Sequence, residues 1–199
     1  MPKRDVAYMQ GQQDLIVQAA LECMIEKGVP ETSLRDICKR AGVSIGAFYV
    51  HFSSREELIL AACAYDSDVY AFDPLPDTWE EFASAIIAMF KYLRTPGQMR
   101  RLRLSLQFVA DLAVADVVPS GLEALYQRRT TPLRELLAHL HERGEITLPL
   151  GWSATTTTVF NFLLGSNYVM VSSHGSKPVD RPEDILPSVA LLVGRKTGD

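Results

Sequence analysis

Cysteine is scarce in this sequence and gives no sign of a cross-linked or metal-bound fold. Only three cysteines occur, Cys23, Cys38 and Cys63, and no two are spaced as in CxxC. An odd number without that spacing indicates neither a disulfide framework nor a zinc site. Each lies on the apolar side of an expected helix, where a buried thiol acts as a small hydrophobic side chain. A redox-sensing thiol is the alternative, although no basic neighbour favours the thiolate.

The sequence also lacks an apolar segment that would direct it to or across a membrane. The N-terminus, MPKRDVAYMQ, has no apolar core of the kind found in signal peptides. The apolar stretch Trp152–Ser172 is interrupted by Asn161, Ser166 and Asn167, which is too polar for a membrane span. We therefore expect a cytoplasmic protein without a membrane partner.

Histidine pairs give no metal site either. His139 and His141 are two residues apart on an expected helix. At that spacing their side chains point to different faces and cannot share a metal ion. We expect no metal and no cofactor.

Net positive charge is lacking as well: the chain carries −4, which by itself argues against a nucleic-acid partner. The distribution of charge matters more than the total. Between Gly28 and Arg55 the local balance is +2. The cations in that window are Arg35, Lys39, Arg40 and Arg55. Three further arginines, Arg100, Arg101 and Arg103, are typical of a solvated helix face.

Residues 33–52, SLRDICKRAGVSIGAFYVHF, carry the clearest structural pattern in the chain. The apolar residues Leu34, Ile37 and Ala41 are three and four positions apart, which predicts a helix with one buried side. Gly42 follows where a helix commonly ends in a left-handed residue. The first helix of the stretch is therefore expected to end at the glycine.

A second short helix is expected directly afterwards, over Ile45–Val50. Ser44 can cap its start, and its spacing places Phe48 against the first helix. Two helices that share a buried face across a tight, glycine-containing turn form a helix-turn-helix. The second helix of such a unit lies in the major groove of DNA. The stretch therefore predicts a DNA-binding regulator.

The same window also fits an enzyme motif, since Gly42-Val43-Ser44-Ile45-Gly46 matches G-x-S-x-G. The nucleophile elbow of serine hydrolases requires a buried apolar strand before the serine. The preceding residues, DICKRA, are charged and have a helical period. We therefore favour a helix cap at Ser44 and expect no enzyme. A serine hydrolase that uses Ser44, with His174 and an unassigned aspartate, is the enzyme alternative.

The longer stretch TSLRDICKRAGVSIGAFYVHFSSREELI resembles the N-terminal domain of the tetracycline-repressor (TetR) family. The shared features are Thr32 and Ser33 before the first helix, AGVS at Ala41–Ser44, and Tyr49-x-His51-Phe52 after the turn. Arg55 stands where the family usually has a lysine. The resemblance covers residues 12–60; the rest fits only in length and helical character. It implies a transcriptional repressor that binds a palindromic operator as a homodimer and is released by a small organic effector.

The expected fold is all-α, with two domains. A three-helix helix-turn-helix DNA-binding domain is expected over residues 1–54, closed by a helix over Gln12–Lys27 that follows an N-terminal arm of residues 1–10. A helical bundle for ligand binding and dimerisation is expected over residues 55–199. Its first helix starts near Ser53, connects the two parts and ends before Pro74–Thr78.

The second domain is expected to contain five further helices. Their apolar residues recur at helical spacing, and prolines or glycines follow most of them. Pro132 predicts a kink or break near Arg129. Trp152–Ser172 is rich in β-branched residues, which favour a strand. We nevertheless expect a helix there, because no partner strand is available and the resemblance implies a helix at this place. The expected helices are Thr78–Arg94, Gln98–Ala115, Ser120–Arg143, Trp152–Ser172 and Glu183–Gly194.

The expected DNA contacts lie at the ends of the two motif helices. Tyr49 and Arg55 are expected to hold phosphates, because contacts there fix the register of a protein on DNA. A core position capping the motif is the alternative for Tyr49. The weaker phosphate candidates are Thr32, Ser33 and Lys39, and the motif residues Ser44 and His51 complete the set.

Base reading is expected from Ile45, Gly46 and Ala47. The resembled family often has lysine at the position of Ile45 and threonine at that of Ala47. The two apolar residues here suit contact with thymine methyl groups. Gly46 would let the helix approach the DNA closely.

The last two helices are expected to form the dimer interface, because they are apolar around much of their circumference. The residues concerned are Phe160, Leu164, Tyr168, Val171, Val189 and Leu192. A role in the core of a single chain is the alternative. A four-helix interface agrees with bundle packing and with the resembled family's usual mode.

A ligand cavity in the second domain is implied by the resemblance and suited by its aromatic residues. The candidate ligand-binding residues are Phe82, Phe90, Phe108, Tyr126 and Asn161. Apolar walls with a few polar groups suit an organic effector of moderate size. An aromatic core without a cavity is the alternative, as is an effector that is a protein.

Overall fold

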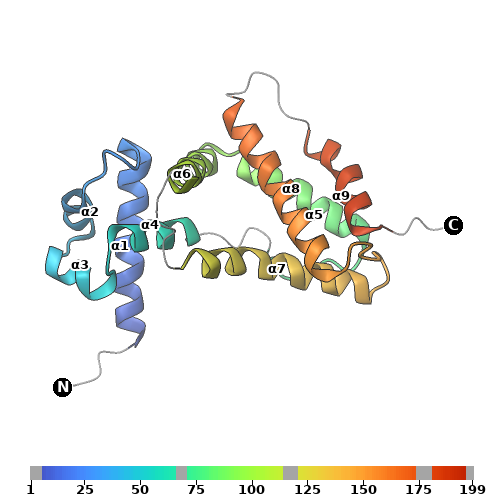
Figure 1. Cartoon of the computed structure of the whole chain (residues 1–199), viewed down its shortest axis with the longest axis horizontal. Coiled ribbons are helices and arrows are strands. Elements are labelled where there is room, and N and C mark those ends of the chain that lie inside the picture. Colours follow the sequence, from blue (N-terminus) through green and yellow to red (C-terminus); the bar gives the residue numbers. More distant parts are fainter. Residues whose placement is uncertain (1–5, 66–70, 114–120, 174–180, 196–199) are drawn as a thin grey trace. The chain divides into compact units, whose positions relative to one another are not determined.

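The computed structural model describes residues 6–65, 71–113, 121–173 and 181–195 of the 199-residue chain. Within these ranges the regular elements are helices, and the only strand-like pairing is an isolated antiparallel bridge between Ile146 and Arg195. The expected all-α fold is therefore confirmed. In chain order (Figure 1) the helices are α1 (Val6–Lys27), α2 (Leu34–Ala41), α3 (Ile45–His51), α4 (Arg55–Ala64), α5 (Trp79–Leu93), α6 (Pro96–Ala113), α7 (Leu122–Glu142), α8 (Trp152–Ser172), the 3-10 helix η1 (Pro182–Ile185) and α9 (Leu186–Val193).

The chain divides into two compact units, each with its own apolar core. Unit 1 comprises residues 1–66 and 104–125, and unit 2 comprises residues 67–103 and 126–199. The division falls inside α6 and inside α7. The functional boundary expected at residue 54 stays a prediction.

Unit 1 is built on the long helix α1, beside which α2 and α3 lie in Figure 1. Helix α4 also packs on α1, and Phe108 and Leu125 join the same cluster. The side chains at its centre are almost fully buried: Ile16, Ile37, Phe48, Phe52 and Leu58. Helices α1 to α3 thus form the expected three-helix unit.

Helix α1 begins earlier than expected. The N-terminal arm predicted for residues 1–10 is wrong for residues 6–10, which are helical. Gln10 Nε2 donates to Asp14 Oδ1 at 3.0 Å, a contact one turn along the helix that supports this extension. Lys3 and Arg4 lie outside the described residues.

Unit 2 has a core of aromatic and aliphatic side chains from α5, α7, α8 and α9. Trp79, Phe82, Ile86 and Leu136 are among its buried members. Of the kink or break predicted near Arg129, the break is wrong, since α7 continues through Pro132. Fully buried leucines beyond the proline hold the helix against the core, and such tertiary packing outweighs one lost hydrogen bond.

Prolines set two helix boundaries in unit 2 that sequence periodicity placed differently. Pro96 is the first residue of α6, where its missing N–H costs no helical hydrogen bond. The last predicted helix is divided into η1 and α9, and Pro187 lies in the first turn of α9. Helix α8 has the bounds that were predicted for it.

Contacts between distant parts of the sequence close unit 2 around the start of α5. The Trp79 backbone N–H donates to Glu145 Oε2 at 3.0 Å. Arg195 pairs with Glu80 at 2.8 Å and lies 5.0 Å from the centre of the Trp79 ring. Among the helices described, none has an apolar stretch long enough to cross a membrane.

Candidate nucleic-acid interface

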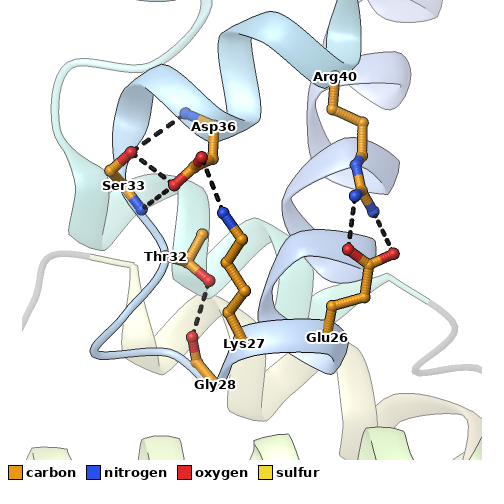
Figure 2. A network of polar contacts seen from close by, with 7 residues as sticks. All are labelled: Glu26, Lys27, Gly28, Thr32, Ser33, Asp36 and Arg40. Atoms are coloured by element: carbon orange, nitrogen blue, oxygen red, sulfur yellow. Dashed lines mark hydrogen bonds and ion pairs between the residues drawn. The ribbon is translucent and has the colours of Figure 1, made fainter.

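Helix α2 begins in a network of polar contacts that Figure 2 shows from close by. The Asp36 backbone N–H donates to Ser33 Oγ at 3.2 Å, and the Ser33 backbone N–H donates to Asp36 Oδ2 at 3.1 Å. This reciprocal pair is a capping box. Lys27 Nζ lies 2.8 Å from Asp36 Oδ1. The Lys27 ammonium and the Ser33 groups hold the pKa of Asp36 well below its usual range.

Arg40 points from α2 toward α1 and is occupied there. Its guanidinium donates to both carboxylate oxygens of Glu26, at 2.8 and 2.5 Å (Figure 2), and Glu22 lies 3.5 Å away. The Glu26 carboxylate raises the pKa of Arg40. The local charge balance counted from the sequence includes this cation but omits its two acidic partners. Arg40 is therefore not available to a phosphate in this arrangement.

Two of the predicted phosphate ligands are directed into the protein. Thr32 is 2% exposed, and its hydroxyl donates to the Gly28 carbonyl oxygen at 2.7 Å (Figure 2). Arg55 Nη2 donates to the carbonyl oxygens of Val29 and Thr32. The Arg55 side chain thus ties the start of α4 to the loop before α2. Its contact with DNA stays a prediction.

Two other cations of α2 remain exposed. Arg35 and Lys39 are four residues apart, so they share one face of the helix. Neither side chain forms an ion pair or a hydrogen bond with any residue that the structure describes. Lys39 was predicted as a candidate. Arg35 was not, although its spacing of four from Lys39 was a usable signal.

The turn after α2 has the expected geometry. Gly42 ends α2 in the left-handed region at φ 68° and ψ 26°, a conformation that costs other residues free energy. The Ala47 backbone N–H then donates to Ser44 Oγ at 3.0 Å, so Ser44 is the N-cap of α3. The cap and the glycine set the orientation of α3.

Helix α3 buries one side and exposes the other. Phe48 is 0% exposed and Phe52, just after the helix, is 1% exposed. On the opposite side Ile45 is 43%, Tyr49 57% and Val50 59% exposed. Gly46 is exposed beside them, whereas Ala47 and His51 are half-buried. We call Ile45, Gly46, Tyr49 and Val50 the outer face of α3. Val50 was missed, although it lies one turn beyond Gly46.

Tyr49 is 57% exposed and so is not the core residue of the alternative, while its contact with a phosphate stays a prediction. Its ring packs edge-on against Phe48, with centroids 5.2 Å apart and planes at 84°. Its hydroxyl makes no hydrogen bond with the part of the chain that the structure describes. The ring is anchored while the hydroxyl stays available to a phosphate.

The structure does not support the serine hydrolase alternative. A helix, not a strand, precedes Ser44, and the Ser44 hydroxyl accepts from the backbone of Ala47. A nucleophile elbow needs the serine exposed at a strand end. His174, the histidine considered for this role, lies outside the described residues.

Two cysteines of unit 1, Cys23 and Cys38, are poorly suited to redox sensing. Cys23 and Cys38 are buried, and burial raises the pKa of both thiols. A raised pKa disfavours the reactive thiolate. The side chain of Cys63 lies outside the described residues.

The candidate ligand-binding residues of the sequence are not all brought together. Phe82 and Phe90 are buried in the core of unit 2, and Tyr126 packs against that cluster, edge-on to Phe160 at 5.6 Å. Phe108 belongs to the core of unit 1 instead, and Asn161 is exposed on α8.

The residues predicted for the dimer interface differ in how far they are buried within one chain. Phe160, Val171 and Val189 are buried within their own chain, whereas Leu164, Tyr168 and Leu192 are half-buried. The most exposed apolar side chains of α8 and α9 are different ones, Trp152 at 44%, Val169 at 50% and Leu191 at 80%.

Comparison with known proteins places the helix-turn-helix in a defined family. A family model described as "Bacterial regulatory proteins, tetR family" matches residues 16–62. TtgW of Pseudomonas putida, an uncharacterised HTH-type transcriptional regulator, is 31% identical over 101 residues, which are 48% of this chain and 73% of TtgW. SrpR of Pseudomonas putida, an HTH-type transcriptional regulator, is 27% identical over 147 residues, 71% of this chain and 63% of SrpR.

The fold itself extends beyond the matched segment. The crystal structure of a TetR-family transcriptional regulator from Pectobacterium atrosepticum is similar with a TM-score of 0.66 at 19% sequence identity. The similarity covers 96% of each chain. Both units of this chain therefore have counterparts in that fold.

Proposed function

The chain belongs to the tetR family of bacterial regulatory proteins, and on that premise we propose that it is a transcriptional repressor that binds a palindromic operator as a homodimer. The observation that carries the proposal is the exposed outer face of α3, together with the exposed cations Arg35 and Lys39 on the preceding helix α2. An exposed second helix of a helix-turn-helix is the element that enters the major groove. Cations on the helix before it suit the flanking phosphates.

Dimerisation follows from the small size of this surface. Helix α3 has seven residues, too few for specific affinity from one copy. A two-fold dimer presents two such helices to half-sites one helical turn apart. Val169 on α8 and Leu191 on α9 supply exposed apolar surface for the contact between copies. The half-buried Leu164, Tyr168 and Leu192 extend this surface.

Release by a small organic effector is the regulatory part of the proposal. Phe82 and Phe90 in the core of unit 2, with Tyr126 packed against it, supply the aromatic side chains near which an effector would bind. Thr155 Oγ1 and Asn167 Oδ1 are buried without a hydrogen-bond partner among the described residues, and a ligand could supply donors to them. An effector that prefers one dimer arrangement by about 1.4 kcal/mol changes DNA affinity about tenfold. No catalytic step is part of this function.

A binding experiment with matched variants tests the proposal. Wild-type protein would select duplexes from a random pool, and the selected duplex would be titrated by fluorescence anisotropy. We expect a palindromic duplex, a dimer in sedimentation at micromolar protein concentration, and binding of one dimer per duplex. Failure to enrich any duplex, or tight binding of the full palindrome by a monomer, would overturn it.

Leu191→Asp tests the interface, with Leu150→Asp as its control. Leu191 is 80% and Leu150 55% exposed, so neither substitution should disturb the fold. We expect Leu191→Asp to be monomeric and to lose operator binding, while Leu150→Asp remains a dimer. If the Leu191→Asp variant is still a dimer, the dimer interface does not include Leu191.

A further inference from the structure

We propose that this protein recognises its operator through thymine methyl groups, which contact Ile45 where Gly46 lets the DNA approach the backbone of α3. This inference rests on the proposed function and adds to it the chemistry of sequence recognition. The outer face of α3 then binds in the major groove of a half-site that contains thymine.

The side chains of the outer face restrict how bases can be recognised. Bidentate recognition of a base edge requires Arg, Lys, Asn, Gln, Asp or Glu. Helix α3, with the sequence IGAFYVH, contains none of these residues. Its N-terminal exposed side chain is Ile45, and N-terminal residues of a recognition helix are the ones that reach base edges. The apolar group that a base presents in the major groove is the thymine methyl.

Gly46 is not required by the fold. A Cβ added there would meet Ser44 Oγ at 3.9 Å, an ordinary contact, and the residue has no left-handed backbone conformation. Glycine inside a helix is less stable than alanine. An exposed helical glycine whose conformation and surroundings do not require it leaves room for a partner to approach the helix backbone closely. On this helix that approach would be made by the DNA.

Charge on the neighbouring helix complements the DNA backbone but carries no sequence information. Arg35 and Lys39 are exposed, whereas Lys27 and Arg40 are in ion pairs and Arg55 is bound to carbonyl oxygens. Phosphate contacts fix position, so discrimination between sequences falls to the apolar residues of α3. Val50, one turn beyond Gly46 and 59% exposed, would be a second apolar contact.

Replacement of thymine by uracil in the selected operator tests the inference directly. Each thymine of a half-site is replaced in turn by deoxyuridine, which removes only the methyl group. We expect at least one position at which affinity falls about fourfold, which is the effect of losing the burial of one methyl group. Replacement in both half-sites should multiply the loss to about fifteenfold.

The Ile45→Ala variant identifies the partner of that methyl group. In a double-mutant cycle the uracil substitution should cost little affinity once Ile45 is shortened. Uracil that costs nothing at any position would overturn the inference, as would an equal loss in wild type and Ile45→Ala. If no duplex is selected at all, the proposed function fails and the inference falls with it.

Gly46→Ala gives an independent result, with Gly11→Ala on α1 as its matched control. An added Cβ at Gly11 meets no heavy atom within 4 Å in the described chain, so both variants should keep or raise the melting temperature. We expect Gly46→Ala to weaken operator binding at least tenfold and Gly11→Ala to leave it unchanged. A Gly46→Ala protein with wild-type affinity would overturn the close approach.

Discussion

The helix caps of unit 1 and the contacts around the start of α5 in unit 2 differ in the sequence distance that they join. In unit 1 the helix caps join residues three positions apart, Ser33 with Asp36 and Ser44 with Ala47. In unit 2 the contacts around α5 join residues far apart, with Trp79 and Glu145 separated by 66 positions and Glu80 and Arg195 by 115. Local contacts leave a recognisable motif in the sequence, whereas distant ones do not.

The units also differ in how they depart from the rule that apolar side chains are buried and buried polar atoms are hydrogen-bonded. Unit 1 exposes apolar side chains on α3, and unit 2 buries the polar atoms Thr155 Oγ1 and Asn167 Oδ1 without a partner among the described residues. Departures of both kinds cost stability and tend to occur at functional sites. The first agrees with the proposed DNA contact and the second with the proposed effector site.

The two units can be followed separately in solution. Both tryptophans of the chain, Trp79 and Trp152, belong to unit 2. Tryptophan fluorescence therefore reports the unfolding of unit 2, while circular dichroism at helical wavelengths reports both units.

Gly194→Ala should destabilise unit 2 most. Gly194 ends α9 at φ 65°, and an added Cβ would lie 2.8 Å from Pro149 Cδ and closer still to Thr147 Oγ1. The left-handed conformation and the overlap together should lower the free energy of unfolding by about 3 kcal/mol, measured by fluorescence in urea.

Gly151→Ala is the control for that substitution. Gly151 also has a positive φ, 76°, but an added Cβ meets no heavy atom within 4 Å in the described chain. We expect a loss of about 2 kcal/mol from the backbone conformation alone, because φ 76° with ψ 170° is a conformation that essentially only glycine adopts. Equal losses in the two variants would show that the contact with Pro149 does not contribute.

Arg55→Ala should destabilise unit 1 by about 2 kcal/mol, because charged hydrogen bonds to two carbonyl oxygens are lost. Circular dichroism should show the loss while the fluorescence midpoint stays unchanged. Arg35→Ala, which removes an exposed cation, should change stability by less than about 0.5 kcal/mol and lower the salt slope of DNA binding by about one. If Arg55→Ala instead lowers the slope at unchanged stability, Arg55 is the phosphate ligand expected from the sequence.

Asn167→Leu should stabilise unit 2 by about 1 kcal/mol, since it removes a buried carbonyl oxygen that has no protein partner among the described residues. Asn161→Leu, on the exposed side of the same helix, should leave the fluorescence midpoint nearly unchanged. A destabilised Asn167→Leu protein would mean that the amide is hydrogen-bonded in solution.

The smallest expected effect is on how the stability of unit 1 depends on acidic pH. The pKa of Asp36 is lowered in the folded protein by Lys27 and Ser33. Because this pKa is lowered by folding, the ionised carboxylate stabilises the fold at any pH above about 3.9, the pKa of an aspartate in the unfolded chain. This stabilisation is lost as the pH falls below that value toward the lower pKa of the folded protein. Between about pH 5 and pH 3 the urea midpoint of unit 1 should therefore fall less in Asp36→Asn than in wild type. Equal falls would contradict this.

Much of unit 1 could be predicted from sequence because its signals are local. The bounds of α2, the left-handed Gly42 and the cap at Ser44 follow from residues within one turn of each other. The partners of the cationic side chains could not be predicted in the same way. Arg40 meets Glu26 fourteen positions away, and Arg55 meets Val29 twenty-six positions away. Such pairs become visible only when α1, α2 and α4 are packed together.

Sequence by itself determined the helical class and the helix-turn-helix, because periodicity, glycine and serine caps act over one or two turns. Tertiary structure decided which of the candidate residues remain available to a partner. Thr32 and Arg55 are turned inward, Arg35 and Val50 outward, and Phe108 is in the core of unit 1 rather than unit 2. Exposure depends on neighbours that are distant along the chain, and only folding brings those neighbours together.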